Sequence, residues 1–177
     1  PLVRNQRPIL LMRRRAAEMT KYTANAFLTL KISFINQIAN ICEKLGIDVN
    51  EVRSGIGTDA RIGFQFLHPG VGYGGSWFPK DVQVLAHVAR KAGVHADLIE
   101  QVHEINQRQR ELLFNRIVER FNGDLKGRTL AFWGISFKPK TDDIREAPAV
   151  TLIERALAAG AKARAHDPEA LDRLKAQ

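Results

Sequence analysis

The longest patterned stretch of the chain runs from Ala16 to Leu45, where apolar residues recur at spacings of three and four without an intervening Pro or Gly. This periodicity predicts an α-helix that is apolar on more than one side and that ends at Gly46. A helix of about 30 residues is about 45 Å long, which is more than a small domain covers alone. We therefore expect it to pack against a partner helix from a second copy of the chain.

Shorter helical patterns follow. The segment "GIDVNEVRSGIG" predicts a short helix that Asp48 or Asn50 caps and Gly55 closes. A glycine-rich loop then leads to "DVQVLAHVARKAG", a predicted helix that starts near Pro79 and ends at Gly93. Its inward positions are Val82, Leu85, Ala86, Val88 and Ala89. A further helix is predicted over residues 96–121.

At Gly123 the pattern changes from helical to mixed. "RTLAFWGI" is an apolar run of strand length, the polar loop "SFKPKTDDIREAP" follows, a helix is predicted over 148–159, and "AKARAH" alternates like a strand. This is one βαβ unit, and one helix cannot cover both faces of a sheet. The expected fold is a mainly α domain with a long helix, followed by a Rossmann-like parallel α/β domain that is cut short at Gln177.

Composition narrows the class of protein. The 177 residues are 45% apolar and 26% charged, as in globular proteins, and no apolar run approaches the roughly 18 residues that span a bilayer. Cys42 is the single cysteine, so an internal disulfide and a Cys-rich metal site are excluded. We expect a cytoplasmic protein with no metal site and no membrane partner.

The net charge of +8 raises the question of a nucleic-acid partner. Most basic residues are dispersed, which favours a solvated surface with a few anion contacts. One cluster is either a polyanion-binding arm or an edge strand or linker: Arg4, Arg7, Arg13, Arg14 and Arg15. Because no aromatic residues interleave with it to stack on bases, we expect no nucleic-acid partner.

Gly70, Gly72 and Gly75 formally satisfy the dinucleotide pattern G-x-G-x-x-G. That pattern binds a dinucleotide only where it follows a buried strand and opens a helix, and "FQFLHP" precedes it here. The match is therefore interpreted as coincidence. The glycines can adopt positive φ and let a ligand approach backbone amides, or they can form a tight turn without a ligand.

Several polar residues could carry chemistry. Lys21 and Asn25 share one face of the long helix and could polarise an oxyanion or orient a water, or form a solvated helix face. Asp81 could be a general base, or could lie in the first helical turn because the helix dipole favours it. Three cations after the first strand suit a phosphate, or belong to a loop that caps the next helix: Lys138, Lys140 and Arg145.

Three strings in order, "EMTKYTANAFLTLKISFINQIANICE", "GIGTDARIGFQFLHPGVGYGGSWFPKD" and "WGISFKPKTDDIREAPA", closely resemble the UDP-glucose 6-dehydrogenase family. The resemblance covers residues 18–168, and "RIG" and "YGGS" look more like the UDP-glucose enzymes than their GDP-mannose relatives. It implies oxidation of the C6 alcohol of UDP-glucose to the acid, in two hydride transfers to NAD through a cysteine thioester.

The resemblance also implies roles for individual residues. Lys21 and Asn25 resemble the pair that stabilises the oxyanion and positions substrate or water, and Asp81 resembles the carboxylate that assists the water. Lys80 and Arg145 resemble residues near the cofactor. The implied substrate contacts are Arg61, which reaches across the dimer, the loop residues His68, Gly70, Gly72, Tyr73 and Gly74, and the uridine and sugar contacts Phe137 and Lys138.

One position departs from the family. Trp77 stands where "GGSCFPKD" has the nucleophilic cysteine, and an indole cannot form a thioester. It is also larger than a thiol and is expected to fill the space where the reacting carbon would stand. Cys42 is expected to be a buried, inert thiol on the long helix rather than a replacement.

The resemblance implies three segments, with boundaries at 1–15, 16–122 and 123–177. These are the end of an NAD-binding domain, with "QRPILLM" as its last strand, the central helical dimerisation and substrate domain, and the first βαβ unit of a UDP-binding domain. We expect a fragment that forms a homodimer through the long helix and does not oxidise UDP-glucose alone. The alternative is a non-catalytic dimerisation or interaction module.

Overall fold

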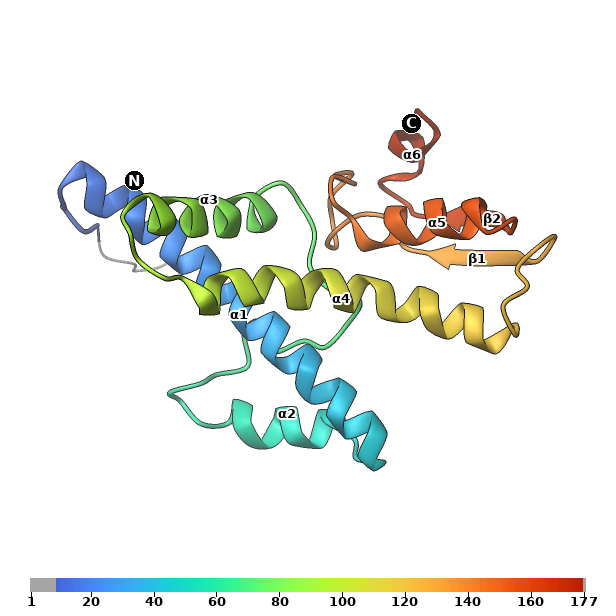
Figure 1. Ribbon diagram of the computed structural model, residues 1–177, viewed down its shortest axis with the longest axis horizontal. Coiled ribbons are helices and arrows are strands. Elements are labelled where there is room, and N and C mark those ends of the chain that lie inside the picture. Colours follow the sequence, from blue (N-terminus) through green and yellow to red (C-terminus); the bar gives the residue numbers. More distant parts are fainter. Residues whose placement is uncertain (1–8, 177) are drawn as a thin grey trace.

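The computed structural model describes residues 9–176. Its helical part is built around α1 (Arg14–Leu45), which crosses the molecule diagonally in Figure 1 and packs against α3 (Phe78–Lys91) and α4 (Asp97–Arg120). The helix predicted over 16–45 is confirmed, and it ends where Gly46 adopts a φ of 68°. At the contact with the other two helices lie Ile35, Val82 and Val102, each at most 3% exposed.

The helix α2 (Val49–Gly57) lies beside the far end of α1. Asp48 caps it, because its carboxylate accepts a hydrogen bond from the Asn50 amide at 2.8 Å. The prediction that Gly55 closes this helix is wrong, since the helix continues to Gly57. Its end coincides with a close contact, because a Cβ on Gly57 would lie 2.4 Å from the Phe64 ring.

The predicted boundaries of α3 and α4 hold to within about one or two residues, as expected for frayed helix ends. Pro79 lies in the first turn of α3, and Gly93, at φ 70°, follows its end. The predicted inward face of α3 is correct for Val82, Leu85 and Ala86. It is wrong for Val88, which is 42% exposed because α3 ends beyond the edge of the helical core.

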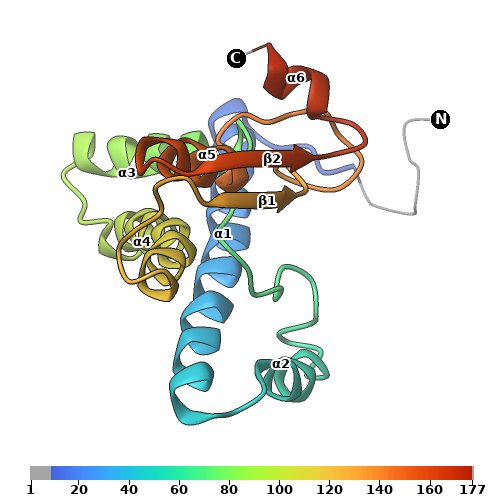
Figure 2. The ribbon, with the colours of Figure 1, turned by 90° about the vertical axis from the view of Figure 1, so that its right-hand side faces the viewer.

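The strands β1 (Thr129–Trp133) and β2 (Lys162–His166) pair in parallel, and α5 (Pro148–Ala158) connects them. This confirms the predicted βαβ unit. Figure 2 shows both strands with α5 behind them. Phe132 faces the core, whereas Trp133 is 91% exposed on the open side of the sheet. The core continues into α4 through Phe114, Ile117, Val118 and Phe121, so the α/β unit is seated on the end of that helix.

The expected strand "QRPILLM" is only partly described. Residues 9–13 form no strand, because no neighbouring strand lies beside them in the described range, and α1 begins at Arg14. Arg4 and Arg7 of the basic cluster lie outside the described residues. Arg13, Arg14 and Arg15 are exposed at the start of α1. Among the residues described, no helix is long and apolar enough to cross a membrane.

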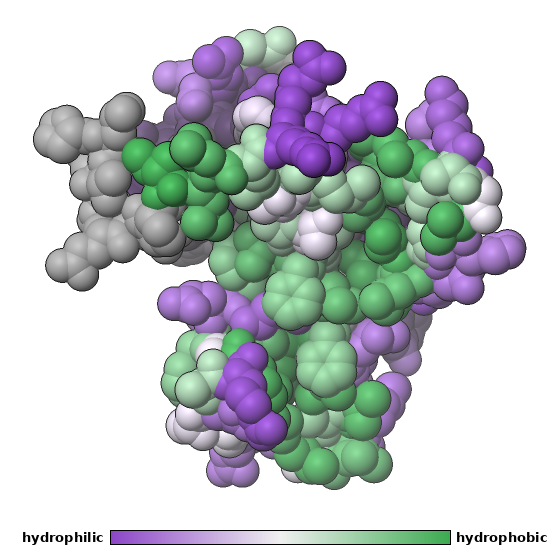
Figure 3. Space-filling view, turned by 90° about the vertical axis from the view of Figure 1, so that its left-hand side faces the viewer, coloured by the Kyte–Doolittle hydropathy of each residue, from purple (hydrophilic) through white to green (hydrophobic). Residues whose placement is uncertain are grey.

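One side of α1 is apolar and uncovered. Phe27, Phe34 and Ile41 recur at intervals of seven residues and are 60%, 49% and 54% exposed, and Leu45 continues their line at 66%. Figure 3 shows a broad hydrophobic area on the side of the molecule where α1 runs. Such a stripe is typical of a helix that packs against another helix.

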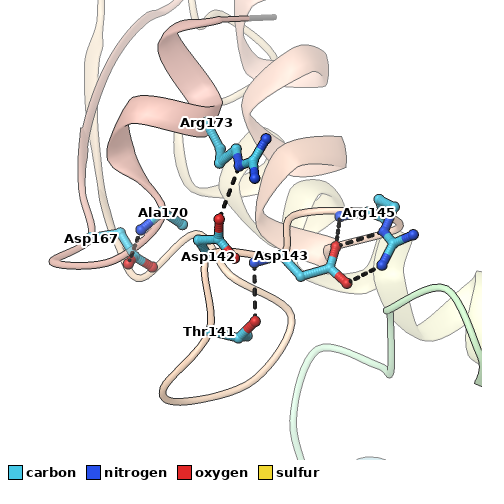
Figure 4. A network of polar contacts seen from close by, with 7 residues as sticks. All are labelled: Thr141, Asp142, Asp143, Arg145, Asp167, Ala170 and Arg173. Atoms are coloured by element: carbon cyan, nitrogen blue, oxygen red, sulfur yellow. Dashed lines mark hydrogen bonds and ion pairs between the residues drawn. The ribbon is translucent and has the colours of Figure 1, made fainter.

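The carboxylate of Asp167, just after β2, fastens the loop that follows β1. It accepts hydrogen bonds from the backbone amides of Ile135, Ser136, Glu169 and Ala170 at 2.7 to 3.0 Å, the last of which is drawn in Figure 4. These amide donors, that of Ile135 first, hold the pKa of Asp167 well below its usual range. The short helix α6 (Leu171–Lys175) follows directly.

Asp167→Asn should lower the free energy of unfolding at neutral pH by about 2 kcal/mol, because buried amides lose their charged acceptor. Since the folded pKa is depressed, the stabilisation is present above the unfolded pKa of about 3.9 and is lost as pH falls toward the folded value. Denaturant unfolding at a series of pH values from 7 downward should therefore show that the free energy of unfolding depends less on pH in the variant than in the parent chain. Asp172→Asn, whose side chain is 98% exposed, is the matched control and should change neither quantity.

Candidate functional site

A cavity of about 780 Å³ lies where the first turns of α1, the start of α3 and the loops before α3 and after β1 meet. Its lining includes eight of the thirteen implied site residues other than Trp77: Lys21, Asn25, His68, Gly72, Tyr73, Gly74, Phe137 and Lys138. Residues from both ends of the chain therefore surround one space. Trp77 also lines it.

A polar cluster lies at one end of this cavity. The Asp81 side chain is 3% exposed, and its Oδ2 accepts hydrogen bonds from Lys21 Nζ at 2.8 Å and Asn25 Nδ2 at 2.6 Å. Lys21 and Asn25 therefore share a helix face as predicted, and both donate to a carboxylate from α3. The first turn of α3 places Asp81 there, where its own amide donates to Trp77 O at 2.8 Å. Lys21 keeps a 51% exposed side chain and remains able to donate to a ligand.

Trp77 lies next to this cluster as the N-cap residue of α3. Its side chain is not packed into the interior, because the residue is 58% exposed. The Nζ atoms of Lys21 and Lys80 each lie 5.0 Å from the centroid of the indole ring, within the range of a cation–π interaction. Lys80 Nζ also lies 3.8 Å from Asp81 Oδ1, so one carboxylate attracts both ammonium groups.

The glycine loop, residues 70–75, makes close contacts with other parts of the protein that leave no room for a side chain at Gly72, Gly74 and Gly75. Gly72 and Gly75 adopt φ of 101° and 82°, and a Cβ on Gly74 would lie 2.1 Å from the carbonyl oxygen of Glu146. Positive φ is therefore confirmed at Gly72 and Gly75, and at Gly74 a protein carbonyl comes close. Approach of a ligand to these amides stays a prediction. Gly70 has no positive φ, and no atom lies within 4 Å of its Cβ position.

Side chains of α1 and α4 hold the glycine loop in place, and none of them was predicted from sequence. Asn106 is 2% exposed, and its amide accepts from Tyr73 N at 2.8 Å and donates to Tyr73 O at 3.0 Å. Asn36 Oδ1 accepts from Gly70 N at 2.7 Å, and Gln109 Nε2 donates to Gly70 O at 2.7 Å. The available signal was the spacing of Asn106, Gln109 and Arg110, three polar residues on one face of a helix.

The loop after β1 docks directly on the glycine loop. Gly75 N donates to Arg145 O at 2.9 Å, and the Phe137 ring fills the space beside Gly75. Arg110, only 6% exposed at its side chain, donates to Glu146 at 3.0 Å and to Thr151 at 2.6 Å. These contacts bring Phe137 and Lys138 of the α/β unit to the cavity of the helical part.

Aromatic side chains form much of the cavity wall. Phe78 packs against Phe66 with ring centroids 6.2 Å apart and against Tyr73 at 5.9 Å, edge to face. Burial raises the pKa of Tyr73 to about 12, so its hydroxyl is neutral in the physiological range. Phe66 adopts a φ of 65°, a conformation that costs a bulky side chain about 1 to 2 kcal/mol. Strain of this kind is concentrated at functional sites.

Five implied site residues are absent from the cavity lining: Asp81, described above, and Arg61, Gly70, Lys80 and Arg145. Arg61 forms a bidentate pair with Asp59, and its side chain is 88% exposed. Gly70 is held by hydrogen bonds to Asn36 and Gln109. Lys80 contacts the Trp77 ring and Asp81, and Arg145 pairs with Asp143.

Arg145 belongs to a second cavity of about 680 Å³, drawn in part in Figure 4. The Arg145 guanidinium, hydrogen-bonded to Asp143, lowers the pKa of that carboxyl to about 2. Across the same space Arg173 donates to Asp142 at 2.9 Å. Both guanidinium groups are thus neutralised by neighbouring carboxylates, so an anion entering this cavity would compete with Asp142 and Asp143.

Family comparisons match the helical part and the α/β part of the chain separately. Residues 15–108 match the central domain of the UDP-glucose/GDP-mannose dehydrogenase family, and residues 131–177 match the UDP-binding domain of that family. The chain belongs to this family. The resemblance drawn from the three sequence strings is therefore confirmed.

Individual relatives agree. The chain is 51% identical over 170 residues to a UDP-glucose 6-dehydrogenase of Pseudomonas aeruginosa and 41% identical over 175 residues to one of Rhizobium meliloti. These matches cover 96% and 99% of the chain but only 38% and 40% of the relatives. The chain thus spans about two fifths of the length of these dehydrogenases.

Solved structures of family members share the fold. A UDP-glucose dehydrogenase of Pyrobaculum islandicum superimposes with a TM-score of 0.91 at 37% identity, covering 96% of this chain and 39% of that one. A GDP-mannose dehydrogenase of Pseudomonas aeruginosa gives a TM-score of 0.57 at 31% identity, covering 92% and 36%. Of these two, the UDP-glucose dehydrogenase is the more similar in structure.

The G-x-G-x-x-G match does not form a dinucleotide fingerprint in this family member. Gly70, Gly72 and Gly75 lie in a loop that leads from no strand, and protein atoms occupy the space beside Gly72 and Gly75. Lys80 and Arg145, the two implied cofactor contacts, are held by Asp81 and Asp143. No group of three or more His, Cys, Asp or Glu side chains between residues 9 and 176 could hold a metal ion.

Proposed function

We propose that the 780 Å³ cavity binds a UDP-hexose, with UDP-glucose as the first candidate. The observation that carries the proposal is that one cavity is lined both by Lys21 and Asn25, which Asp81 holds through hydrogen bonds, and by Phe137 and Lys138. A sugar needs hydrogen-bonding groups at its hydroxyls, and a uracil needs an aromatic or apolar wall. The cavity contains both kinds of surface.

The chemistry available to the chain's own residues is binding and orientation. Lys21 and Asn25 would donate hydrogen bonds to the sugar, Asp81 would fix both donors, and Lys138 would face the diphosphate. Phe137 would contact the uridine. The family matches support a division of labour between the helical segment 16–122 and the α/β segment 123–177, with the ligand between them.

Oxidation does not follow from these residues. Trp77 occupies the position that carries the nucleophilic cysteine in the dehydrogenases this chain resembles, and an indole cannot form a thioester. Cys42 is only 4% exposed on α1 and lies outside the cavity lining. Because the G-x-G-x-x-G match forms no dinucleotide fingerprint, we propose that the chain alone binds UDP-glucose without turnover, and that binding of NAD would require further protein.

Calorimetric titration with UDP-glucose tests this function. The chain should bind saturably, and Lys138→Ala should weaken binding about tenfold, as expected for loss of one charged contact. Lys175→Ala, at a lysine that pairs only with the exposed Asp172, is the matched control. Absence of binding by the folded parent chain would contradict the proposal, and steady NADH formation with NAD present would contradict the lack of turnover.

Trp77→Cys should create a reactive thiol. Position 77 caps the N-terminus of α3, and the ammonium groups of Lys21 and Lys80 lie around it, so the pKa of a thiol there should fall below its usual range. Iodoacetamide at pH 7 should alkylate this thiol at least about 20-fold faster than Cys42. Mass spectrometry of the peptides measures both sites in one sample, and equal rates would contradict the expected electrostatic environment.

A second candidate function is a dimerisation module, favoured by the exposed stripe of Phe27, Phe34 and Ile41 on α1. A homodimer through this helix would cover the hydrophobic area of Figure 3. Sedimentation should then show a dimer at micromolar concentration and a monomer for Phe34→Glu. A well-folded monomeric parent chain would count against this function.

A further inference from the structure

The cavity combines aromatic walls with a small number of polar groups at one end. Phe66, Tyr73, Phe78 and Phe137 line it together with Trp77, while Lys21 and Asn25 supply donors. A pyranose ring has the complementary character, because each face presents aliphatic C–H groups and the rim carries hydroxyls. Aromatic rings bury such apolar faces without needing to satisfy a polar group.

Trp77 differs from the other four rings in its exposure and its position. It is 58% exposed, whereas Tyr73 is 6% exposed, so its surface is available to a ligand in the cavity. It also lies next to the donors that would meet the sugar, since Lys21 Nζ is 5.0 Å from the indole centroid. An aromatic surface beside sugar-binding donors is in the place where a hexose ring would stack.

The indole is held in a defined place despite its exposure. The ammonium groups of Lys21 and Lys80 both lie 5.0 Å from the ring centroid, and Asp81 accepts from the first and attracts the second. One carboxylate therefore holds both cations beside the indole. Because Trp77 is still 58% exposed, ring surface is left for a ligand, and little conformational entropy is lost when the sugar stacks on it.

We infer that Trp77 is a sugar-binding residue: its indole stacks on the hexose ring of a UDP-sugar and so converts the cavity into a site that retains this ligand without reacting with it. The inference rests on the proposed UDP-hexose site and adds the residue that distinguishes a UDP-hexose from UDP. It replaces the expectation that the indole only obstructs the place of the reacting carbon. Obstruction predicts weaker binding of the sugar, whereas stacking predicts stronger binding.

Fluorescence of a single-tryptophan chain tests the contact directly. Trp133 is the only other tryptophan and is 91% exposed on β1, so Trp133→Phe leaves Trp77 as the sole indole at little cost in stability. Titration with UDP-glucose should change the Trp77 emission saturably, and UDP at saturation should change it much less. Equal emission changes with UDP and UDP-glucose would overturn the inference.

Affinities of variants distinguish stacking from obstruction. Trp77→Ala should weaken UDP-glucose binding about tenfold and leave UDP binding unchanged, while Trp77→Phe should restore most of the difference. Thermal unfolding of each variant shows that it folds. If Trp77→Ala binds UDP-glucose as tightly as the parent or more tightly, the inference is wrong while the proposed site stands. If the folded parent binds neither UDP-glucose nor UDP, both the inference and the proposed function fail.

Discussion

Asp81→Ala should be among the most damaging single substitutions in the chain. The carboxylate is buried and accepts from Lys21 and Asn25, so its loss leaves one cation and one amide without their acceptor. Removing one partner of a buried ion pair costs about 3 to 5 kcal/mol. Because Lys21 is 51% exposed and can hydrate, we expect a smaller loss, about 2 kcal/mol in the free energy of unfolding.

The same substitution should weaken UDP-glucose binding at least about tenfold, since Lys21 and Asn25 lose the group that orients them. Denaturant unfolding and calorimetry measure the two effects. Glu104→Ala is the control, because Glu104 forms an exposed pair with Arg108 one helical turn away. It should change stability by at most about 0.5 kcal/mol. A stable Asp81→Ala chain with unchanged affinity would show that the cluster does not organise the site.

Gly74→Ala should separate the glycine loop from the loop after β1. The new Cβ would lie 2.1 Å from the backbone carbonyl oxygen of Glu146, which cannot move aside as a side chain can. We expect a loss of about 3 kcal/mol in unfolding free energy, typical of severe overpacking. Phe137 and Lys138 would also be displaced from the cavity, so the affinity for UDP-glucose should fall together with the stability.

Gly70→Ala is the control for that experiment. It lies in the same loop, its φ is ordinary and no atom lies within 4 Å of the Cβ position. Its unfolding free energy should stay within about 0.5 kcal/mol of the parent value. If both variants lost equal stability, the close approach of Glu146 would not be the reason for glycine at position 74.

Local patterns of the sequence predict most of the fold. The apolar spacing of 16–45, the terminators Gly46 and Gly93, and the change of pattern at Gly123 each correspond to an element boundary in the structure. The predicted helix ends are wrong where a contact distant in sequence coincides with the true end. Gly55 does not end α2, because the helix continues to Gly57, against which the Phe64 ring packs.

The candidate site could be predicted only in part. Lys21, Asn25 and Asp81 stand out by spacing and family motif, but their shared hydrogen bonds depend on how α3 packs on α1. Asn36 was missed because a single buried amide that holds a loop has no local pattern, and Asn106 because its polar spacing with Gln109 and Arg110 does not show which loop it holds. Their partners, Gly70 and Tyr73, are more than thirty residues away in the chain.

Hydrogen–deuterium exchange with and without UDP-glucose tests the central claim most directly, because it locates the ligand along the chain. If the ligand binds between the two parts of the molecule, exchange should slow at the amides of 72–77 and of 136–138 together. Protection confined to residues 141–145 and 173–176, which line the second cavity, or no protection at a saturating concentration, would contradict the account.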